Sequence, residues 1–212
     1  MGRSILGDDH HGPYARFGKR ALDIVAVILA APFVLPVLAL LALLAMLDGG
    51  PAFYGQTRVG RGGRKFTCWK IRTMVRDADS KLDACLAADP AAAAEWRETQ
   101  KLRNDPRVTP VGRFMRAMSL DELPQLWNVL IGDMSLVGPR PFLPEQQHLY
   151  PGSAYYSLRP GLTGFWQVGD RNDATFAARA VDDARYAREM SLGTDLATIA
   201  RTVAVVARGT GF

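Results

Sequence analysis

The feature that most constrains the fold of this chain is an apolar run over residues 24–47. It contains no charged or strongly polar side chain along its 24 residues. A helix needs about 20 such residues to cross the hydrocarbon core of a bilayer. The apolar region of a secretory signal is shorter, at about 7–15 residues, so cleavage is not expected. The sequence therefore predicts a membrane element that stays in the mature protein.

Two features indicate that this element enters the bilayer without crossing it. Pro32 and Pro36 lie near its middle, where each removes a backbone donor and obstructs the preceding turn. We therefore predict a re-entrant helix-break-helix over residues 16–48; a kinked spanning helix is the alternative, since spanning helices tolerate proline. Basic residues flank both ends, and the positive-inside tendency draws both toward the cytoplasm. They are Arg16, Lys19 and Arg20 before the run and Arg58, Arg61, Arg64 and Lys65 after it.

One acidic residue, Asp23, stands at the edge of the run. It is either an interfacial residue or a partner for Arg20, which lies one helical turn earlier. The sequence leaves both interpretations open.

The length and pattern of the chain predict its domain organisation. With 212 residues it can bury one sizeable core. We predict a disordered leader over residues 1–15, the membrane hairpin over 16–48 and a cytoplasmic catalytic domain over 49–212. The expected fold class is α+β and mostly helical, in a monotopic membrane protein that carries a small β-hairpin.

The composition narrows the chemistry. The net charge of +5 fits an anionic membrane surface or anionic substrates. Nucleic acid is not an expected partner, because no helix-turn-helix, zinc-finger or RNP-like pattern is present. The chain has two cysteines and three histidines without metal-type spacing, which leaves little material for a zinc site or a histidine-based triad. Catalysis is therefore expected to depend on carboxylates and arginines.

Three stretches carry clear local structure. Residues 52–54 and 65–71 flank a glycine-rich turn at residues 60–64 and predict a β-hairpin. Asp89 followed by Pro90 is typical of a helix start, with the aspartate as cap. Residues 191–207 predict a helix that either joins the core, which we favour, or lies at the membrane interface.

An adjacent pair of carboxylates, Asp121 and Glu122, occupies another predicted helix start. Ser119 followed by Glu122 matches a capping box, and Asp121 in a first turn suits the helix dipole. Taken alone, the pair is explained by these structural roles. Pro124 leaves the helix boundary unfixed, because proline prefers the first turn.

The surrounding arginines favour phosphate chemistry instead. Arg113 and Arg116 lie upstream, and Arg140 stands between two prolines that restrict its backbone. Arg159 precedes Pro160 and Gly161, an arrangement that resembles a type II turn. Each arginine alone would be a surface charge, but together with the carboxylates they suit a diphosphate substrate.

Several ordered motifs resemble one family. The chain is similar to the bacterial sugar transferases, the monotopic phosphoglycosyl transferases that begin exopolysaccharide and glycoconjugate assembly. The resemblance runs from about residue 16 to the C-terminus and is closest to the small form, which contains only the catalytic domain. The motifs are Lys19-Arg20-x-x-Asp23, Lys70-Ile-Arg-Thr-Met74, Ser119-Leu-Asp-Glu-Leu-Pro-Gln-Leu-Trp-Asn128-Val, Gly132-Asp-Met-Ser-Leu-Val-Gly-Pro-Arg-Pro141 and Arg159-Pro-Gly-Leu-Thr-Gly-Phe-Trp-Gln167.

The resemblance implies transfer of a sugar-1-phosphate from a UDP-sugar to undecaprenyl phosphate, with release of UMP and with Mg²⁺ as cofactor. In such enzymes the aspartate of the pair attacks the β-phosphorus and the glutamate helps to hold the metal. These roles fall on Asp121 and Glu122. The resemblance also implies a location on the cytoplasmic face of the bacterial inner membrane.

By the same carry-over, Lys70, Arg140 and Arg159 are expected at the nucleotide diphosphate or the prenyl phosphate, and Asp183 is expected near the site. The family often has Ser-Pro at the break of the re-entrant helix, whereas this chain has Leu35-Pro36. A non-catalytic membrane scaffold with the same fold is the alternative function. The resemblance leans toward a hexose-1-phosphate, such as glucose or galactose, and leaves open both the sugar and a homo-oligomeric state.

Overall fold

The computed structural model describes residues 12–99, 102–169 and 176–207. The leader predicted for residues 1–15 therefore lies largely outside the described residues. The mostly helical α+β class is confirmed. Helices are α1 (Lys19–Ala45), α2 (Ala78–Ala88), α3 (Pro90–Thr99), α4 (Pro110–Ala117), α5 (Gln125–Ile131), α6 (Ala154–Ser157), α7 (Phe165–Val168), α8 (Arg179–Glu189) and α9 (Leu192–Ala207). Strands are β1 (Phe53–Val59), β2 (Lys65–Ile71), β3 (Ser135–Val137) and β4 (Gly161–Thr163).

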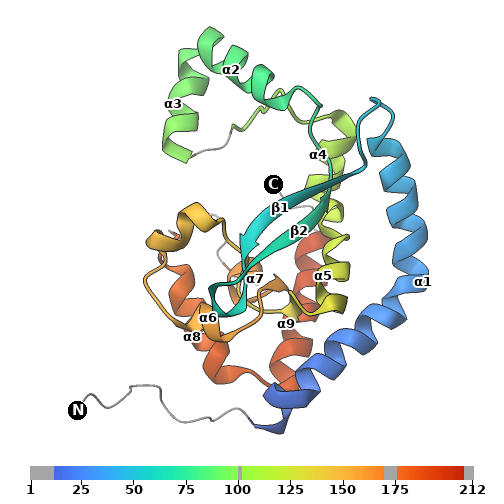
Figure 1. The fold of residues 1–212 in the computed structure, drawn as a ribbon, viewed down its shortest axis with the longest axis vertical. Coiled ribbons are helices and arrows are strands. Elements are labelled where there is room, and N and C mark those ends of the chain that lie inside the picture. Colours follow the sequence, from blue (N-terminus) through green and yellow to red (C-terminus); the bar gives the residue numbers. More distant parts are fainter. Residues whose placement is uncertain (1–11, 100–101, 170–175, 208–212) are drawn as a thin grey trace.

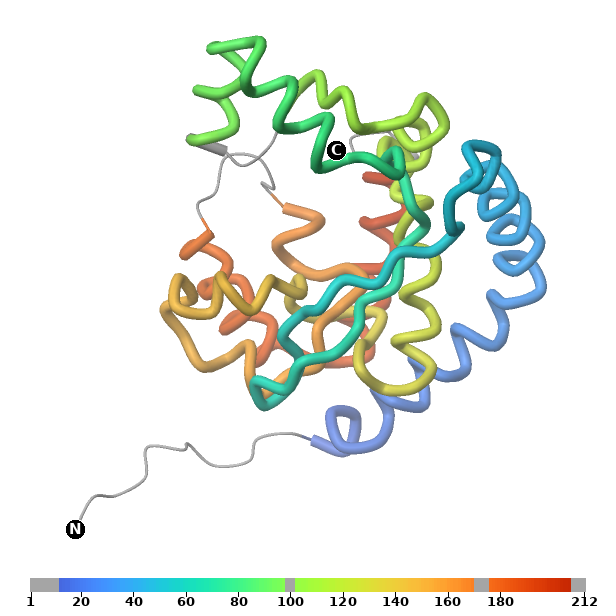
Figure 2. Tube along the Cα trace, turned by 45° about the horizontal axis from the view of Figure 1, so that its top comes forward, coloured from blue at the N-terminus to red at the C-terminus, as the bar shows by residue number. Residues whose placement is uncertain are grey.

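The elements surround a central hairpin. In Figures 1 and 2, α1 forms one edge of the molecule and α6 and α8 the opposite edge, with β1 and β2 between them. Helices α2 and α3 project at one end. The β1–β2 hairpin is antiparallel, as predicted, and pairs Tyr54 with Lys70. Side chains alternate along a strand, so Tyr54, Gln56 and Lys70 share one face.

Helix α1 is the membrane candidate. In the described part of the chain, the helical stretch over residues 14–45 is the one long and apolar enough to cross a membrane. Only 11% of its most apolar window is buried, unlike the core helix of a soluble protein. It is continuous through Pro32 and Pro36 and bends part-way along (Figure 1), so the prolines do not divide it into two helices. Its re-entrant placement in a bilayer stays a prediction.

The N-terminal end of α1 is bound to the rest of the protein by polar contacts. Lys19 Nζ lies 2.7 Å from Asp195 Oδ2 on α9, in a buried ion pair. Arg20 donates to the carbonyls of Val129 and Leu130 at the end of α5. A cation suits the negative end of a helix dipole, so this contact stabilises α5 as well as joining it to α1.

Asp23 does not pair with Arg20, which corrects one of the two interpretations of the sequence. Its Oδ1 accepts from the Ser135 hydroxyl at 3.0 Å and from the Leu136 amide at 2.9 Å. The carboxylate is 1% exposed and lies against β3. Asp23 therefore belongs to the contact between α1 and β3.

The C-terminal half of α1 packs against the hairpin and α4. Leu41 joins Ile71 of β2 and Met115 of α4 in a buried cluster. Burial of such side chains stabilises the contact by about 1.5–3 kcal/mol each. Both halves of α1 thus pack against the part of the chain that follows it.

The capping box predicted at Ser119 and Glu122 is wrong. The segment Leu120–Glu122 is a 3₁₀ turn, Ser119 makes no side-chain cap, and α5 begins only at Gln125 after Pro124. The proline supplies a suitable start, because its missing amide is not needed there. Asp121 and Glu122 therefore precede the helix instead of forming its first turn.

A second local prediction, the type II turn at Pro160 and Gly161, is also wrong. Gly161 has no positive φ and begins β4, which pairs in parallel with β3. A Cβ there would lie 2.1 Å from the amide nitrogen of Gly138. Glycine is needed at this position for close backbone approach, not for a turn.

Two predicted helices are confirmed. Asp89 caps α3, because its Oδ1 accepts from the amides of Ala91 at 2.8 Å and Ala92 at 3.2 Å. Helix α9 joins the core through buried Asp195 and Thr198.

Candidate active site

The carboxylate pair lies on the 3₁₀ turn that joins α4 to α5. Ser119, just before it, has a φ of 54°, the one positive φ among non-glycine residues in the described ranges. Such conformations cost energy and persist where the surroundings fix them, often at functional sites. Asp121 is 8% exposed, whereas Glu122 is half-buried.

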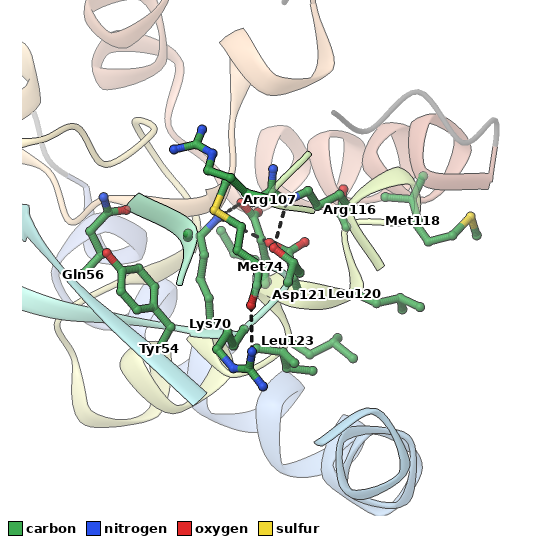
Figure 3. A pocket seen from close by; sticks show the side chains of 18 of the residues that line it. Tyr54, Gln56, Lys70, Met74, Arg107, Arg116, Met118, Leu120, Asp121 and Leu123 are labelled. Carbon is green, nitrogen blue, oxygen red and sulfur yellow. Dashed lines mark hydrogen bonds and ion pairs between the residues drawn. The ribbon is translucent and has the colours of Figure 1, made fainter. Parts of the chain in front are cut away.

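Lys70 of β2 contacts both carboxylates. Its Nζ lies 2.8 Å from Glu122 Oε1 and 3.6 Å from Asp121 Oδ2. Arg140, from the segment after β3, places Nη2 3.5 Å from the same Glu122 oxygen. A strand, a turn and a loop that are far apart in the sequence thus bring two cations to one carboxylate pair. Figure 3 shows Lys70, Arg116 and Asp121 converging in the pocket.

These groups line a pocket of about 870 Å³. The hairpin face that carries Tyr54, Gln56 and Lys70 forms one wall, and α9 contributes Thr202 and Val206 to another. The lining includes six basic side chains and three acidic ones. The basic residues are Lys70, Arg72, Arg76, Arg107, Arg116 and Arg140, and the acidic residues are Asp79, Asp121 and Glu122. This excess of positive charge favours an anionic ligand.

The arginines of the pocket differ in how far they are neutralised. Arg107 forms an ion pair with Asp105, with Nη2 and Oδ2 2.7 Å apart. Arg116 instead donates through Nε to the hydroxyl of Thr73 at 2.8 Å, and no described carboxylate lies within ion-pair distance of it. Thr73 holds the Arg116 guanidinium through Nε, and the two Nη atoms of Arg116 stay available to a ligand.

The environment of Asp121 acts on its pKa in both directions. Burial raises the pKa above the ordinary value, and Glu122 raises it further, whereas Lys70 and Arg116 lower it. The two cations therefore favour the carboxylate form that burial opposes.

Five predicted site residues converge in this pocket: Lys70, Arg116, Asp121, Glu122 and Arg140. Three others lie outside its lining. Arg113 is exposed on α4, and Arg159 donates through Nε to the carbonyl of Gly132 at 3.0 Å. Asp183 is buried on α8, where its Oδ2 accepts from the hydroxyl of Tyr150 at 2.8 Å. Burial raises the pKa of Asp183 to about 7.

Sequence reasoning missed residues that organise the site. Asn128 is fully buried on α5; its Oδ1 accepts from the Trp69 amide at 3.1 Å and its Nδ2 donates to the Thr67 carbonyl at 2.8 Å. It joins the helix after the carboxylate pair to the strand that carries Lys70. Thr73, which holds Arg116, was also missed. Both residues lie within the quoted motifs, but nothing in their type marks these contacts.

Asp121 and Glu122 are also the candidate ligands for a metal ion. The described residues contain no cluster of three or more histidine, cysteine or acidic side chains that could hold a metal ion alone. Mg²⁺ is commonly bound by one or two carboxylates together with substrate phosphates. Asp121 and Glu122, which share the cation Lys70, fit that kind of site.

Comparison with known proteins agrees with this geometry. A family model described as bacterial sugar transferase matches residues 14–209. The chain belongs to the bacterial sugar transferase family. The whole of the pocket described above lies within the stretch that matches this sugar transferase model.

Three relatives illustrate the similarity of this sugar transferase to known proteins. It is 46% identical over 199 residues to the UDP-galactose-lipid carrier transferase of Erwinia amylovora. That alignment covers 93% of this chain and 42% of the relative. It is 43% identical to the exopolysaccharide production protein ExoY of Rhizobium meliloti, in an alignment that covers 94% of this chain and 89% of ExoY. It is 42% identical to the UDP-glucose:undecaprenyl-phosphate glucose-1-phosphate transferase of Caulobacter vibrioides, in an alignment that covers 87% of this chain and 68% of the relative. The chain thus spans less than half of the Erwinia relative and most of ExoY.

Proposed function

We propose that this protein transfers a sugar-1-phosphate from a UDP-sugar to undecaprenyl phosphate and releases UMP. The observation that carries the proposal is the Asp121–Glu122 pair, held by Lys70 in a cation-rich pocket beside an exposed apolar helix. The names of the relatives support both substrates. This reaction would be the first membrane step of exopolysaccharide or glycoconjugate assembly.

In the first step, a carboxylate oxygen of Asp121 attacks the β-phosphorus of the UDP-sugar. A bond forms between that oxygen and phosphorus, and the bond from phosphorus to the oxygen bridging the two phosphates breaks. UMP leaves with the electron pair of that bond. The product is a sugar phosphate joined covalently to Asp121, which divides one difficult transfer into two displacements.

In the second step, a phosphate oxygen of undecaprenyl phosphate attacks the same phosphorus. The bond to Asp121 breaks, and the carboxylate is restored. Displacement at phosphorus places the attacking and leaving oxygens roughly in line. The lipid phosphate must therefore approach from the position that UMP has left, so one set of cations serves both groups.

The basic residues reduce the electrostatic repulsion between the anionic Asp121 carboxylate and the anionic diphosphate that it attacks. Lys70 lies between the two carboxylates, Arg140 is near Glu122, and Arg116 has nitrogens available to a phosphate. Fixed cations stabilise the charge that develops as the bridging oxygen leaves.

Mg²⁺ fits the same site as cofactor. Glu122, with Asp121 beside it, would hold the ion together with the phosphates of the substrate. When bound, the ion neutralises phosphate oxygens and orients the diphosphate. Chelation by EDTA is expected to abolish UMP release, and added Mg²⁺ is expected to restore it.

The proposed placement is the cytoplasmic face of the bacterial inner membrane, with α1 re-entrant. Helix α1 is about 40 Å long by its 27 residues, yet both of its ends contact the catalytic domain. A helix that crossed the bilayer would carry its ends to opposite sides. Labelling of cysteines introduced at Gly12 and Gly55 is expected to place both on the cytoplasmic side, and labelling from opposite sides would refute the re-entrant placement of α1.

The sugar is proposed to be glucose or galactose, because the relatives' names include both. The direct test is UMP release by the purified protein with Mg²⁺, undecaprenyl phosphate and a panel of UDP-sugars. Release with one hexose donor supports the enzyme. Absence of release across the whole panel would favour a non-catalytic scaffold.

A further inference from the structure

Arg72 lines the pocket but is already fully bonded within the protein. It directly follows β2, two residues after Lys70. A guanidinium carries five N–H donors. Nε donates to the Pro51 carbonyl at 2.7 Å, Nη1 to Asp48 Oδ2 and the Met74 carbonyl, both at 2.7 Å, and Nη2 to the Ala45 carbonyl at 2.6 Å and to Asp48 Oδ1. All five donors therefore have acceptors, and none is left for a substrate phosphate.

The acceptors place Arg72 at the C-terminal end of the membrane helix. Ala45 is the last residue of α1, and Asp48 and Pro51 belong to the segment that leads from α1 to β1. The hydrogen bonds from Arg72 lower the pKa of Asp48 to about 2, so this carboxylate stays ionised. One side chain thus joins the end of α1 to the end of the strand that carries Lys70.

The backbone of the connecting segment is shaped around the guanidinium. Gly49 has a φ of 77°, and Asp48 Oδ1 also accepts from the Gly50 amide at 3.1 Å. A Cβ at Gly50 would lie 2.6 Å from Nη2 of Arg72. Glycine at position 50 therefore makes room for the arginine, and alanine there would displace it.

The opposite end of α1 is attached to the other catalytic element. Arg20 binds the final carbonyls of α5, the helix that follows Asp121 and Glu122. The membrane helix is therefore fixed at each end to a segment that adjoins a catalytic side chain. Between the two attachments, Leu35, Leu40 and Leu43 of its C-terminal half are exposed and apolar.

We propose that Arg72 is a positioning residue that holds the C-terminal end of α1 at the pocket, so that a lipid phosphate whose tail lies along α1 reaches the phosphorus on Asp121. The inference rests on the proposed function. A UDP-sugar arrives from water and does not need this contact. The acceptor arrives from the bilayer and depends on where α1 meets the site.

The two half-reactions provide the test. In detergent micelles, UMP release without lipid measures the first step, and transfer to undecaprenyl phosphate measures the second. For Arg72→Lys, Asp48→Asn and Gly50→Ala we expect the UMP burst to stay within about twofold of wild type. We expect kcat/KM for the lipid to fall about tenfold or more, because small misplacements of reacting groups are costly. Asp48→Glu, which keeps the carboxylate, is expected to recover part of the loss.

Arg188→Lys, an exposed arginine on α8, is the matched control and is expected to change neither step. A proportional loss of both steps together with a lower melting temperature would show that Arg72 is merely structural. A raised KM for the UDP-sugar would show that it binds substrate. Either outcome overturns the inference. Absence of a UMP burst in the wild-type protein would instead count against the proposed covalent step.

Discussion

Replacing Lys70 with methionine tests the electrostatics of the site most simply. The ammonium lies 2.8 Å from one carboxylate and 3.6 Å from the other, and its side chain is 22% exposed. At an effective dielectric constant of about 20, these distances correspond to roughly 6 and 5 kcal/mol of attraction before desolvation is subtracted. Truncating one partner of a buried charge pair costs about 2–5 kcal/mol in practice.

A loss of about 3 kcal/mol in the transition state corresponds to a rate about 100-fold lower. We therefore expect the single-turnover rate of UMP release to fall by about that factor in Lys70→Met. The pH dependence should change as well. Lys70 lowers the pKa of Asp121, so its removal raises that pKa further above the ordinary value. The acid limb of the rate profile should then move to higher pH.

The assay is rapid-quench measurement of UMP release between pH 5 and 9, with Lys70→Arg as the control that keeps the charge. Lys70→Arg is expected to retain the wild-type acid limb. A tenfold or smaller loss in Lys70→Met, with an unmoved acid limb, would refute the electrostatic role assigned to this lysine.

Two further predictions concern stability. Asn128→Leu removes the hydrogen-bond partner of the Trp69 amide and of the Thr67 carbonyl, so the free energy of unfolding should fall by roughly 1–3 kcal/mol, whereas exposed Asn104→Leu should change it little in the same thermal melt. Asp183 has a pKa raised to about 7, so its contribution to stability is present below the ordinary aspartate pKa and is lost as pH rises through 7. Asp183→Asn should therefore melt higher than wild type at pH 8 and lose this dependence between pH 5 and 8; an equal slope in both proteins would contradict the assignment.

Much of the local structure was predictable because its causes lie close together in the sequence. The glycine-rich turn at residues 60–64 sets the β1–β2 hairpin, and Asp89 caps the helix that begins one residue later. The capping box at Ser119 failed for a reason that spacing does not reveal. Ser119 adopts a left-handed conformation, and Pro124 starts the helix further along the chain.

The site was only partly predictable. The family resemblance placed Asp121, Glu122 and Lys70 at one site, and they meet in one pocket. The same resemblance led us to expect Arg159 and Asp183 at or near the site; both lie outside the pocket lining, with partners Gly132 and Tyr150 that are set by tertiary packing.

Long-range polar contacts were the hardest to foresee. Lys19 and Asp195 are 176 residues apart, yet they form a buried ion pair. Arg72 was quoted only as part of a motif and given no role, yet its five donors are all used around the end of α1. Such roles depend on which surfaces meet in the fold, and composition and spacing carry no information about that.

The most direct test of the central proposal is the intact mass of the protein quenched after exposure to Mg²⁺ and UDP-glucose or UDP-galactose without lipid. We predict an added mass of one hexose phosphate on the peptide that contains Asp121, loss of that adduct when undecaprenyl phosphate is supplied, and no adduct in Asp121→Asn. Transfer at the wild-type rate by Asp121→Asn, or turnover without any adduct on Asp121, would contradict the covalent mechanism.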